Sequence, residues 1–384
     1  GEWYLHLFDV TQPDLDWSDR DVRDEFVDVL RFWFDRGIDG FRIDVAHGLV
    51  KDPALPDLVY ADNGEPFAVG HPPGHHPYND RDGLREIYRE WRTVADSYDG
   101  DRIFVAEAWV DTPDRLAPYV SPGQLHSAFD FAYLQAPWSG PKLRAIIDSS
   151  RRTIGSVGAH NTWVLSNHDV ELHLTRFGRK MTAGSLLEDP PADPAQVDLA
   201  LGTRRSRAAV MLTLALPGGA YLYQGEELGL PQVLDLPESA LRDPIWKRSG
   251  HTRRGRDGCR VPIPRTVRGP SVGFGVNGSW LPQPPGWGDY SVLAQRHDSD
   301  SMPELYRRLL RMRRELPALG EGELHWLSPA GADVLAFSRD PEFACVVNLG
   351  SVPIELPDHS RVLVTSVPLV DGQLPTDAAA LLAT

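Results

Sequence analysis

Apolar positions in the first half of the chain follow two alternating spacings. Residues 22–36 carry apolar side chains at helical spacing, and the short run 38–43 that follows has the composition of a strand. The same order recurs at 84–98, which predicts a second helix, and at 103–106, which predicts a second buried strand. Further strands are predicted at 128–132, 162–165 and 220–223, with a helix through 208–216 before the last of them. Helices that alternate with strands are typical of a parallel sheet with helical crossovers.

Five predicted strands through residue 223 leave two architectures open. They complete an open, doubly wound α/β sheet, whereas a closed eight-stranded barrel needs three more strands. The chain begins at Gly1 without a Met or a signal peptide. We expect this to be a cut end, so that the three further strands of a barrel would precede it.

The pattern changes near residue 318. Ser301 and Glu304 have the spacing of a capping box, which predicts the start of a helix. Short β-prone runs between turn residues follow at 334–337, 343–347 and 362–364. We therefore expect one α/β domain over 1–318, with long Pro/Gly-rich loops, and a small antiparallel β domain over 319–384.

The composition is that of an ordinary globular protein, with an acidic balance. There are 54 acidic against 39 basic residues, a formal charge of −15 that repels nucleic acid and anionic lipid. No apolar stretch approaches the ~18 residues of a membrane span, so neither nucleic acid nor a membrane is an expected partner. Cys259 and Cys345 cannot build a disulfide framework, which favours a cytoplasmic location.

Three acidic residues each end a predicted strand, at nearly equal spacing: Asp44, Glu107 and Asp169. Because the carboxyl ends of parallel strands gather at one face, we expect these carboxylates to line one cleft. Two carboxylates that flank one bond are what glycoside cleavage needs, since one attacks the anomeric carbon and the other protonates the leaving oxygen. The ordinary alternative is that acids at strand ends cap helices or keep loops soluble.

The neighbours of these acids fit the same chemistry. Arg42 lies two residues before Asp44 and therefore on the same face of the strand, where its charge would hold that carboxylate ionised; a structural ion pair is the alternative. Trp109 would shield Glu107 from water and raise the pKa of that carboxyl, as a general acid requires. The alternative is that the Trp109 side chain only packs in the core. His168 offers hydrogen bonds to sugar hydroxyls.

Three segments resemble signature regions of the α-amylase superfamily, glycoside hydrolase family 13, in the family's order. They are 40–47 (GFRIDVAH), 106–109 (AEAW) and 166–169 (SNHD). Supporting segments resemble the α-glucosidase and oligo-1,6-glucosidase branch: 12–17, 224–229 and 255–260. The resemblance implies a (β/α)8 TIM-type barrel, partial here with strands 4–8 present, followed by a small C-terminal antiparallel β domain.

The resemblance also implies roles for the three acids. Asp44 would be the nucleophile and Glu107 the general acid/base. Asp169 would be the carboxylate that distorts the substrate and stabilises the transition state.

Four further residues would bind substrate. Arg42 and His168 would contact the sugar at the cleavage point, and Arg256 would help to bind the glucose at the non-reducing end. His47 would reach substrate from the loop after Asp44, although a structural hydrogen bond is an equal alternative.

The sequence also departs from the family. Its first signature region, Asp-x-x-x-Asn-His, is absent, and so are the first three barrel strands and the small domain inserted after the third. Leu172 and Arg265 stand where the branch usually has an Arg and a Trp, which leaves fine specificity open. Val45, after the nucleophile, leans towards tolerance of α-1,6 linkages.

Two further patterns do not change the expectation of no cofactor and no metal. Residues 273–278 fit G-x-G-x-x-G, but that fingerprint must open a helix and the proline-rich stretch 282–285 follows it. His71, His75 and His76 lie among prolines in an irregular loop, without the register of a metal site.

The leading hypothesis is a retaining α-glucosidase that removes terminal α-linked glucose from short oligosaccharides, its expected partner. The alternatives are a transglycosylase or sugar isomerase of the same family, or a catalytically incomplete amylase-like fragment or interaction domain. Retention of the three acids argues against an interaction domain. The 384-residue chain by itself is expected to be inactive, because five of eight strands leave a barrel open. Linkage preference and oligomeric state stay open.

Overall fold

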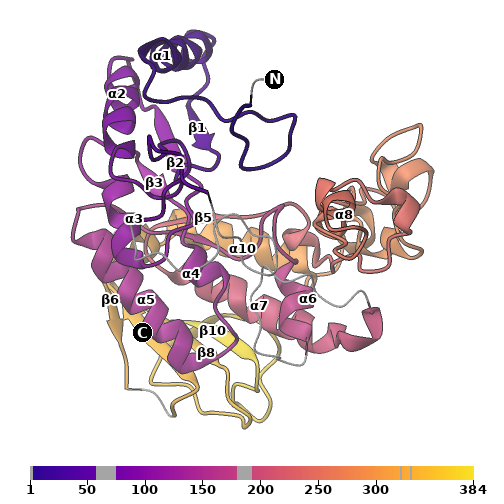
Figure 1. Cartoon of the computed structure of the whole chain (residues 1–384). Coiled ribbons are helices and arrows are strands. Elements are labelled where there is room, and N and C mark those ends of the chain that lie inside the picture. The colour runs from indigo at the N-terminus through magenta and orange to yellow at the C-terminus, as the bar shows by residue number, and fades with distance from the viewer. Residues whose placement is uncertain (1–2, 58–74, 180–192, 321, 329–330) are drawn as a thin grey trace. The chain divides into compact units, whose positions relative to one another are not determined.

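The computed structural model describes residues 3–57, 75–179, 193–320, 322–328 and 331–384 (Figure 1). The chain divides into two compact units. The first consists of residues 1–131 and 147–162, and the second of residues 132–146 and 163–384.

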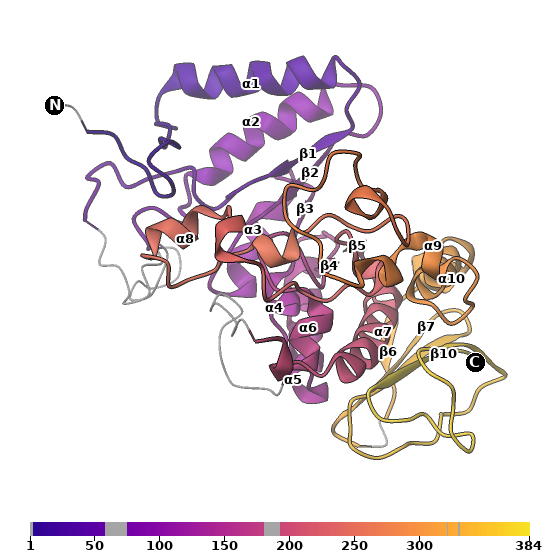
Figure 2. The same ribbon diagram turned by 90° about the vertical axis from the view of Figure 1, so that its right-hand side faces the viewer.

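The first unit is built on a short parallel sheet. Its strand order is β1-β2-β3, and a parallel bridge joins Phe129 to Thr162 beside β3. Helices α1 and α2 lie side by side over this sheet (Figure 2). The bounds are α1 Arg20–Phe34, β1 Gly40–Ile43, α2 Leu84–Asp96, β2 Ile103–Ala106, α3 Pro113–Val120 and β3 Ser127–Ala128. The helix–strand repeat expected for this part of the chain is therefore confirmed.

Local chemistry sets the ends of α1, and its apolar stripe sets its packing. The side chain of Asp19 accepts a hydrogen bond from the backbone N–H of Asp21 and caps the helix. Gly37 follows with φ of 86°, a left-handed conformation that ends the helix at low cost. Leu30 and Phe34 from this stripe are buried in one core with Phe104 of β2.

The strand expected at 128–132 is wrong in its second half. The strand ends at Ala128, and helix α4 (Phe131–Leu134) begins three residues later. The backbone N–H of Asp130 donates to the carbonyl of Thr162 at 2.9 Å, and this contact lies where the chain turns out of the sheet. A short apolar run looks the same in a buried strand and in a buried helix, so spacing alone could not separate the two.

The second unit contains a strand pair, several helices and the C-terminal sheet. Strand β4 (Thr162–Val164) begins in the first unit and pairs with β5 (Gly219–Tyr221), and helix α5 (Gly140–Gly155) also crosses between the units. The other α-helices are α6 His173–Gly178, α7 Leu199–Ala215, α8 Pro244–Arg248, α9 Val292–Gln295, α10 Met302–Glu315 and α11 Pro317–Gly320. Short 3₁₀ helices are η1 Pro194–Gln196, η2 Glu226–Leu228, η3 Glu238–Ala240, η4 Asp257–Cys259, η5 Pro270–Gly273 and η6 Trp287–Tyr290. The side chain of Ser301 caps α10 by accepting from the N–H of Glu304, as its spacing predicts.

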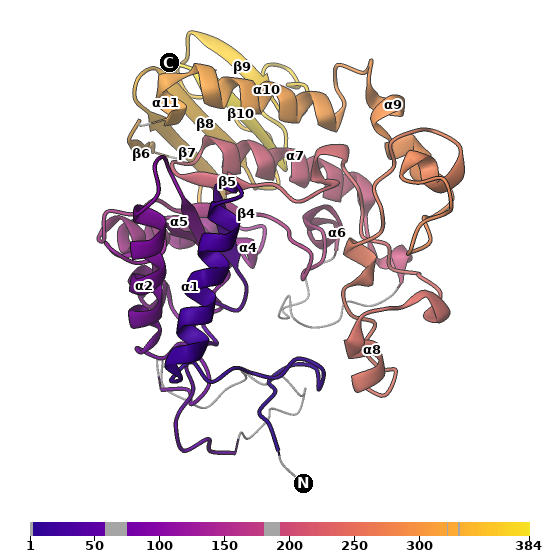
Figure 3. The same ribbon diagram turned by 90° about the horizontal axis from the view of Figure 1, so that it is seen from above.

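The C-terminal residues form an antiparallel sheet in the order β6-β7-β8-β10-β9. Its bounds are β6 Leu324–Trp326, β7 Val334–Arg339, β8 Phe343–Asn348, β9 Arg361–Thr365 and β10 Ala378–Ala383. The expected strands β7, β8 and β9 are confirmed, whereas β6 and β10 were not predicted. Helix α7 packs against β8 and β10 (Figure 3).

A buried arginine joins this sheet to the helices of the second unit. The Arg339 guanidinium is inaccessible to solvent and donates to the carbonyls of Ala215, Leu319, Gly320 and Gly322. The domain boundary expected between 318 and 319 falls inside α11 and stays a prediction. Across the described parts of the chain, no helix combines the length and apolar character that a membrane crossing requires.

Candidate active site

The parallel register of β1 and β2 brings two of the predicted catalytic acids together. Ile43 pairs with Ala106, so Asp44 and Glu107 are the next residues on two adjacent strands, at their carboxyl ends. The N–H of Glu107 donates to the carbonyl of Ile43 at 2.9 Å, which extends this pairing. The first unit therefore presents two carboxylates side by side, as the strand-end pattern predicts.

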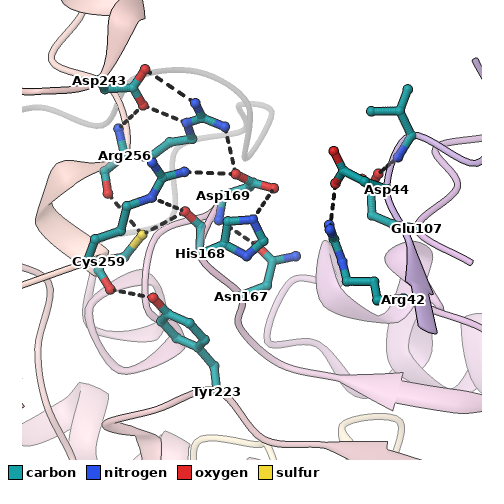
Figure 4. Close-up of polar contacts among 12 residues, drawn as sticks. Arg42, Asp44, Glu107, Asn167, His168, Asp169, Tyr223, Asp243, Arg256 and Cys259 are labelled. Atoms are coloured by element: carbon teal, nitrogen blue, oxygen red, sulfur yellow. Dashed lines mark hydrogen bonds and ion pairs between the residues drawn. The ribbon is translucent and has the colours of Figure 1, made fainter. Parts of the chain in front are cut away.

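Arg42 pairs with Asp44 as strand alternation predicts. The guanidinium Nη1 lies 2.5 Å from Asp44 Oδ1 (Figure 4). Both side chains are accessible to solvent, and that of Asp44 is 70% exposed. The carboxylate of Asp44 is thus an accessible anion held by one cation.

Glu107 lies in a different environment, because it is 5% exposed. Val45 has φ of 45°, unusual for a β-branched residue, and its N–H donates to Glu107 Oε2 at 2.7 Å. Burial raises the pKa of Glu107, and the negative charge of Asp44 raises it further. The N–H of Val45, the Arg42 cation and a hydrogen bond from the Trp109 side chain lower it without cancelling the effect of burial. The two acids therefore lie in unlike environments, one exposed and ion-paired and the other buried.

Trp109 makes a ring contact and a hydrogen bond beside the acids. Its ring stacks on Phe131 with centroids 4.0 Å apart, and its hydrogen bond to Glu107 lowers the pKa of that carboxyl. The raised pKa of Glu107, with burial as its main cause, agrees with the expectation of a carboxyl shielded from water; that Trp109 supplies the shielding stays a prediction.

His47 is buried and interacts with both of these acids. It is 2% exposed, and its Nδ1 accepts a hydrogen bond from the backbone N–H of Trp109 at 3.2 Å. Burial lowers the pKa of His47 to about 4, so the ring is neutral at pH 7. This hydrogen bond holds the loop after β2, so the structural hydrogen bond expected as the alternative role of His47 is present. Contact of His47 with substrate stays a prediction.

In the second unit, Asp169 lies in the loop that follows β4. Its backbone N–H donates to Asn167 Oδ1 at 2.8 Å, which closes a tight turn over His168. The Nε2 atom of His168 lies 3.3 Å from Asp169 Oδ2. Side chain and backbone together thus fix the orientation of this carboxylate.

Two arginines at the ends of η4, Arg256 and Arg260, hold the other oxygen of Asp169. Arg256 Nη1 lies 2.7 Å from Asp169 Oδ1 (Figure 4). Arg260 Nη2 lies 3.0 Å from the same oxygen. Arg260 Nε also donates to the carbonyl of His168 at 2.8 Å. Arg256 was predicted to bind substrate, but the part of Arg260 in holding this loop was not predicted.

Arg256 is itself held by a buried carboxylate. Asp243 has a fully buried side chain and accepts from Arg256 Nε at 2.6 Å and from the backbone N–H of Arg256 at 3.0 Å. Burial opposes ionisation of Asp243, but its hydrogen bonds to Arg256 and to the N–H of Ile245 outweigh burial and lower its pKa. Asp257 in turn accepts from the backbone N–H groups of Arg242 and Asp243. Arg256 thus bridges two carboxylates, the buried Asp243 and the partly exposed Asp169.

The thiol of Cys259 also donates a hydrogen bond to the loop that carries Asp169. Cys259 Sγ lies 3.3 Å from the carbonyl of His168 and 3.1 Å from that of Arg256. Burial raises the pKa of Cys259 to about 12, so the sulfur stays a neutral donor. No sequence signal pointed to Asp243, whose partner Arg256 lies 13 positions away. The segment 255–260 resembled the family branch but assigned no role to Cys259 or Arg260, whose partners His168 and Asp169 lie 91 positions away.

The predicted site residues thus fall into two groups. Arg42, Asp44, His47 and Glu107 belong to the first unit, and His168, Asp169 and Arg256 to the second. The structure brings the members of each group together. A single cleft shared by both groups stays a prediction.

Of the histidines weighed as metal ligands, His71 lies outside the described residues. His75 and His76 are described. Within the described ranges, no group of three or more His, Cys, Asp or Glu side chains is arranged to hold a metal ion.

Comparison with known proteins identifies the family of the chain. The family described as "Alpha amylase, catalytic domain" matches residues 1–322. A trehalose-6-phosphate hydrolase of Bacillus subtilis (strain 168) is 28% identical over 375 residues, which cover 88% of this chain and 60% of the relative. An oligo-1,6-glucosidase of Parageobacillus thermoglucosidasius is 27% identical over 399 residues, covering 94% of this chain and 66% of the relative. The chain thus spans less than two thirds of the length of these relatives.

Solved structures share the fold. The α-glucosyl transfer enzyme XgtA superposes with a TM-score of 0.81 at 30% identity, covering 99% of this chain and 70% of its own. Isomaltulose synthase PalI from Klebsiella sp. LX3 superposes with a TM-score of 0.79 at 23% identity, covering 100% and 72%. The fold is that of the α-amylase catalytic domain, a TIM barrel, with a C-terminal antiparallel sheet; that strands 4–8 of the barrel are the ones present stays a prediction. The chain belongs to the α-amylase family, glycoside hydrolase family 13.

Proposed function

We propose that this chain carries the catalytic groups of a retaining α-glucosidase that removes terminal α-linked glucose from short oligosaccharides. The observation that carries the proposal is the pairing of Asp44 and Glu107 on adjacent strands in unlike environments. Asp44 is exposed and ion-paired, whereas Glu107 is buried and has a raised pKa. One carboxylate is thus suited to attack and the other to give a proton.

The proposed reaction has two displacements. An Asp44 oxygen attacks the anomeric carbon while Glu107 gives its proton to the leaving oxygen, so the C–O bond breaks and a glycosyl ester forms. Glu107, now ionised, takes a proton from water, and the water oxygen attacks the same carbon and releases Asp44. Two inversions restore the original α configuration.

The Asp169 group is proposed to act on the same sugar. Its carboxylate, oriented by Arg256 and Arg260, accepts hydrogen bonds from sugar hydroxyls, and these strengthen as positive charge develops on the ring. Arg256 and His168 extend the polar lining of this subsite. The relatives named above, a disaccharide-phosphate hydrolase and an oligo-1,6-glucosidase, support a short α-glucoside as substrate.

A transglycosylase or sugar isomerase is the second candidate. It is favoured by the 30% identity to an α-glucosyl transfer enzyme over 99% of this chain. The covalent intermediate would be the same, but a sugar hydroxyl would replace water as the attacking group. Product analysis with and without an added sugar acceptor separates the two, because a hydrolase releases free glucose in both cases.

The test of function uses the gene product that contains residues 1–384 and a chromogenic α-glucoside. Proton NMR of the first product should show α-glucose, and Asp44→Asn should abolish its release. Asp101→Asn is the matched control, because Asp101 is an exposed carboxylate before the other end of β2. Release of β-glucose, or normal turnover by the Asp44→Asn variant, would refute the proposal.

A further inference from the structure

Residues of the short helix α6 hold the loop that carries Asp169. The Oγ atom of Ser166 accepts from the backbone N–H of His173 at 2.9 Å and lies 2.9 Å from His173 Nδ1. Arg176 donates to the carbonyl of Leu165 at 3.0 Å and to that of Glu171 at 3.2 Å. Both ends of the loop are therefore tied to one helix.

A buried carboxyl group, that of Glu226, lies beside His173 of α6. Glu226 of η2 is 4% exposed, and its Oε1 lies 3.8 Å from His173 Nδ1. The other oxygen, Oε2, accepts from the hydroxyl of Tyr306 at 3.4 Å, near the limit of a hydrogen bond. In the described part of the chain, Oε1 has no hydrogen-bond partner although it is buried.

The surroundings of Glu226 do not supply what a buried carboxylate needs. An ionised carboxylate in such a place requires a cation or several donors. Arg176 is a cation that acts on it: its Nη1 and Nη2 groups donate to backbone carbonyls, and its buried Nε has no hydrogen-bond partner among the described residues, Glu226 included. Glu227 adds a second negative charge. The remaining hydrogen bonds come from the backbone at Tyr223 and from Tyr306.

The titratable groups around Glu226 are uncharged near pH 7, apart from Arg176 and Glu227. Burial raises the pKa of Glu226 to about 8 and lowers the pKa of His173 to about 3. Burial also raises the pKa of Tyr306 well above its usual value of 10.0. Burial lowers the pKa of Arg176 to about 10, so this group keeps its charge.

We propose that Glu226 is a neutral carboxylic acid in the folded protein, and that with His173 it acts as a positioning residue for the loop that carries Asp169. A neutral acid leaves the His173 ring free to keep its contact with Ser166. An ionised Glu226 would place a negative charge 3.8 Å from His173 Nδ1, attract a proton to that ring and disturb the contact. The positioning of Asp169 for catalysis rests on the proposed function, whereas the protonation state of Glu226 does not.

The proposal sets the sign of a pH dependence. Because the pKa of Glu226 is raised by folding, its contribution to stability is complete below its usual value of 4.5 and is lost as pH rises to about 8. His173 and His47 have lowered pKa values, so they act in the opposite sense, and only below about pH 6.5. The window from pH 6.5 to 8 therefore isolates Glu226 among these three groups.

The test compares Glu226→Gln with the protein that retains Glu226. Glutamine has the same shape and cannot ionise, so the Tm difference in favour of Glu226→Gln should widen steadily from pH 6.5 to 8 and stay constant above about pH 9. Glu227→Gln is a second variant, since Glu227 is the neighbouring carboxylate and accepts from the N–H of Gly225. Because the charge of Glu227 raises the pKa of Glu226, this variant should move the window to lower pH, whereas Glu238→Gln, at an exposed carboxylate of η3, should leave the pH dependence unchanged.

A local measurement tests the positioning role without relying on activity. Amide hydrogen exchange of residues 165–173, corrected for intrinsic base catalysis, should show protection that falls between pH 7 and 9 in the native sequence. Glu226→Gln should keep that protection. If the loop responds to pH in both proteins alike, the positioning role is wrong, whatever the enzyme hydrolyses.

A third measurement needs no variant and therefore holds even if Glu226→Gln fails to fold. Unfolding of the native sequence at pH 7.5 in weak buffer should release about one proton, because the acid becomes ionised when exposed. Release of no proton, or parallel Tm curves for Glu226→Gln and the native sequence, would overturn the proposal.

Discussion

Replacing Asp243 by Asn tests the buried ion pair that holds Arg256 against Asp169. The Asp243 side chain is inaccessible to solvent and accepts from the N–H of Ile245 at 3.0 Å, from the N–H of Arg256 at 3.0 Å and from Arg256 Nε at 2.6 Å. Asparagine keeps the shape but loses the charge. Its amide group would also point N–H donors at donors of Arg256 or Ile245.

The expected cost follows from burial on the two sides of the pair. Removing one partner of a buried ion pair costs about 3–5 kcal/mol. The Arg256 side chain is 41% exposed, and water will solvate it in part, which reduces the cost to about 2–3 kcal/mol. For a unit of roughly 150–250 residues this lowers Tm by about 4–12 °C, at about 2–4 °C per kcal/mol.

The assay is urea and thermal unfolding at pH 7, with Asp235→Asn as the control because Asp235 is an exposed carboxylate in the same loop region. The pKa of Asp243 is lowered, so its contribution is present above its usual value of 3.8 and is lost as pH falls through the folded value. The penalty of Asp243→Asn should therefore shrink between pH 5 and 3. A double-mutant cycle with Arg256→Gln should return a coupling of about 1–3 kcal/mol.

A penalty within about 0.5 kcal/mol of zero would refute this reasoning, because changes of that size are typical of exposed sites. A penalty that does not change with pH would show that the charge of Asp243 is not its source. In the active gene product, the same variant should lower kcat, since a freed Arg256 no longer orients Asp169, whose proposed hydrogen bonds strengthen in the transition state.

Further predictions concern the first unit and the thiol of the second. Glu107→Gln should lower kcat by about 10²–10⁴-fold, without a change in Tm large enough to indicate misfolding, in steady-state assays with a poor leaving group. Because the pKa of Glu107 is raised, kcat/KM of the native enzyme should persist above the usual range of a glutamic acid and fall as pH rises through the folded pKa; a profile already falling from pH 4.5 upward would contradict this. The carboxyl groups of Asp44 and Glu107 should lie roughly 5–5.5 Å apart in a crystal structure, whereas about 9 Å would indicate an inverting enzyme. His47→Leu should remove the loss of stability between pH 6.5 and 4 that a buried neutral histidine causes, as followed by Tm across that range. Cys259→Ala should loosen the loop after β4 and increase hydrogen exchange there, whereas unchanged exchange would mean that the arginines alone suffice.

Local patterns determined most of the first unit before any tertiary contact was considered. The stripes of α1 and α2 and the short apolar runs of β1 and β2 each lie where apolar spacing predicts them. The pairing of Arg42 with Asp44 also follows from local geometry, because residues two apart on a strand face the same way. These features depend on neighbours within a few positions, which the sequence displays directly.

Strand β10 shows what local patterns could not decide. Residues 378–383 read AAALLA, a composition that favours a helix when taken alone. In the folded protein they form the strand between β8 and β9 and are buried against α7. The environment supplied two strand partners and a covering helix, and these contacts outweigh intrinsic propensity.

The candidate site divides in the same way. Three motifs along the chain determined which carboxylates to examine, and strand ends predicted that Asp44 and Glu107 would be neighbours. Only the tertiary structure decided that Glu107 is buried and receives the N–H of Val45, and that Arg260 and Asp243 act on the loop of Asp169. Burial and charge pairing arise from residues far apart in sequence, and they set the pKa values on which the proposed chemistry depends.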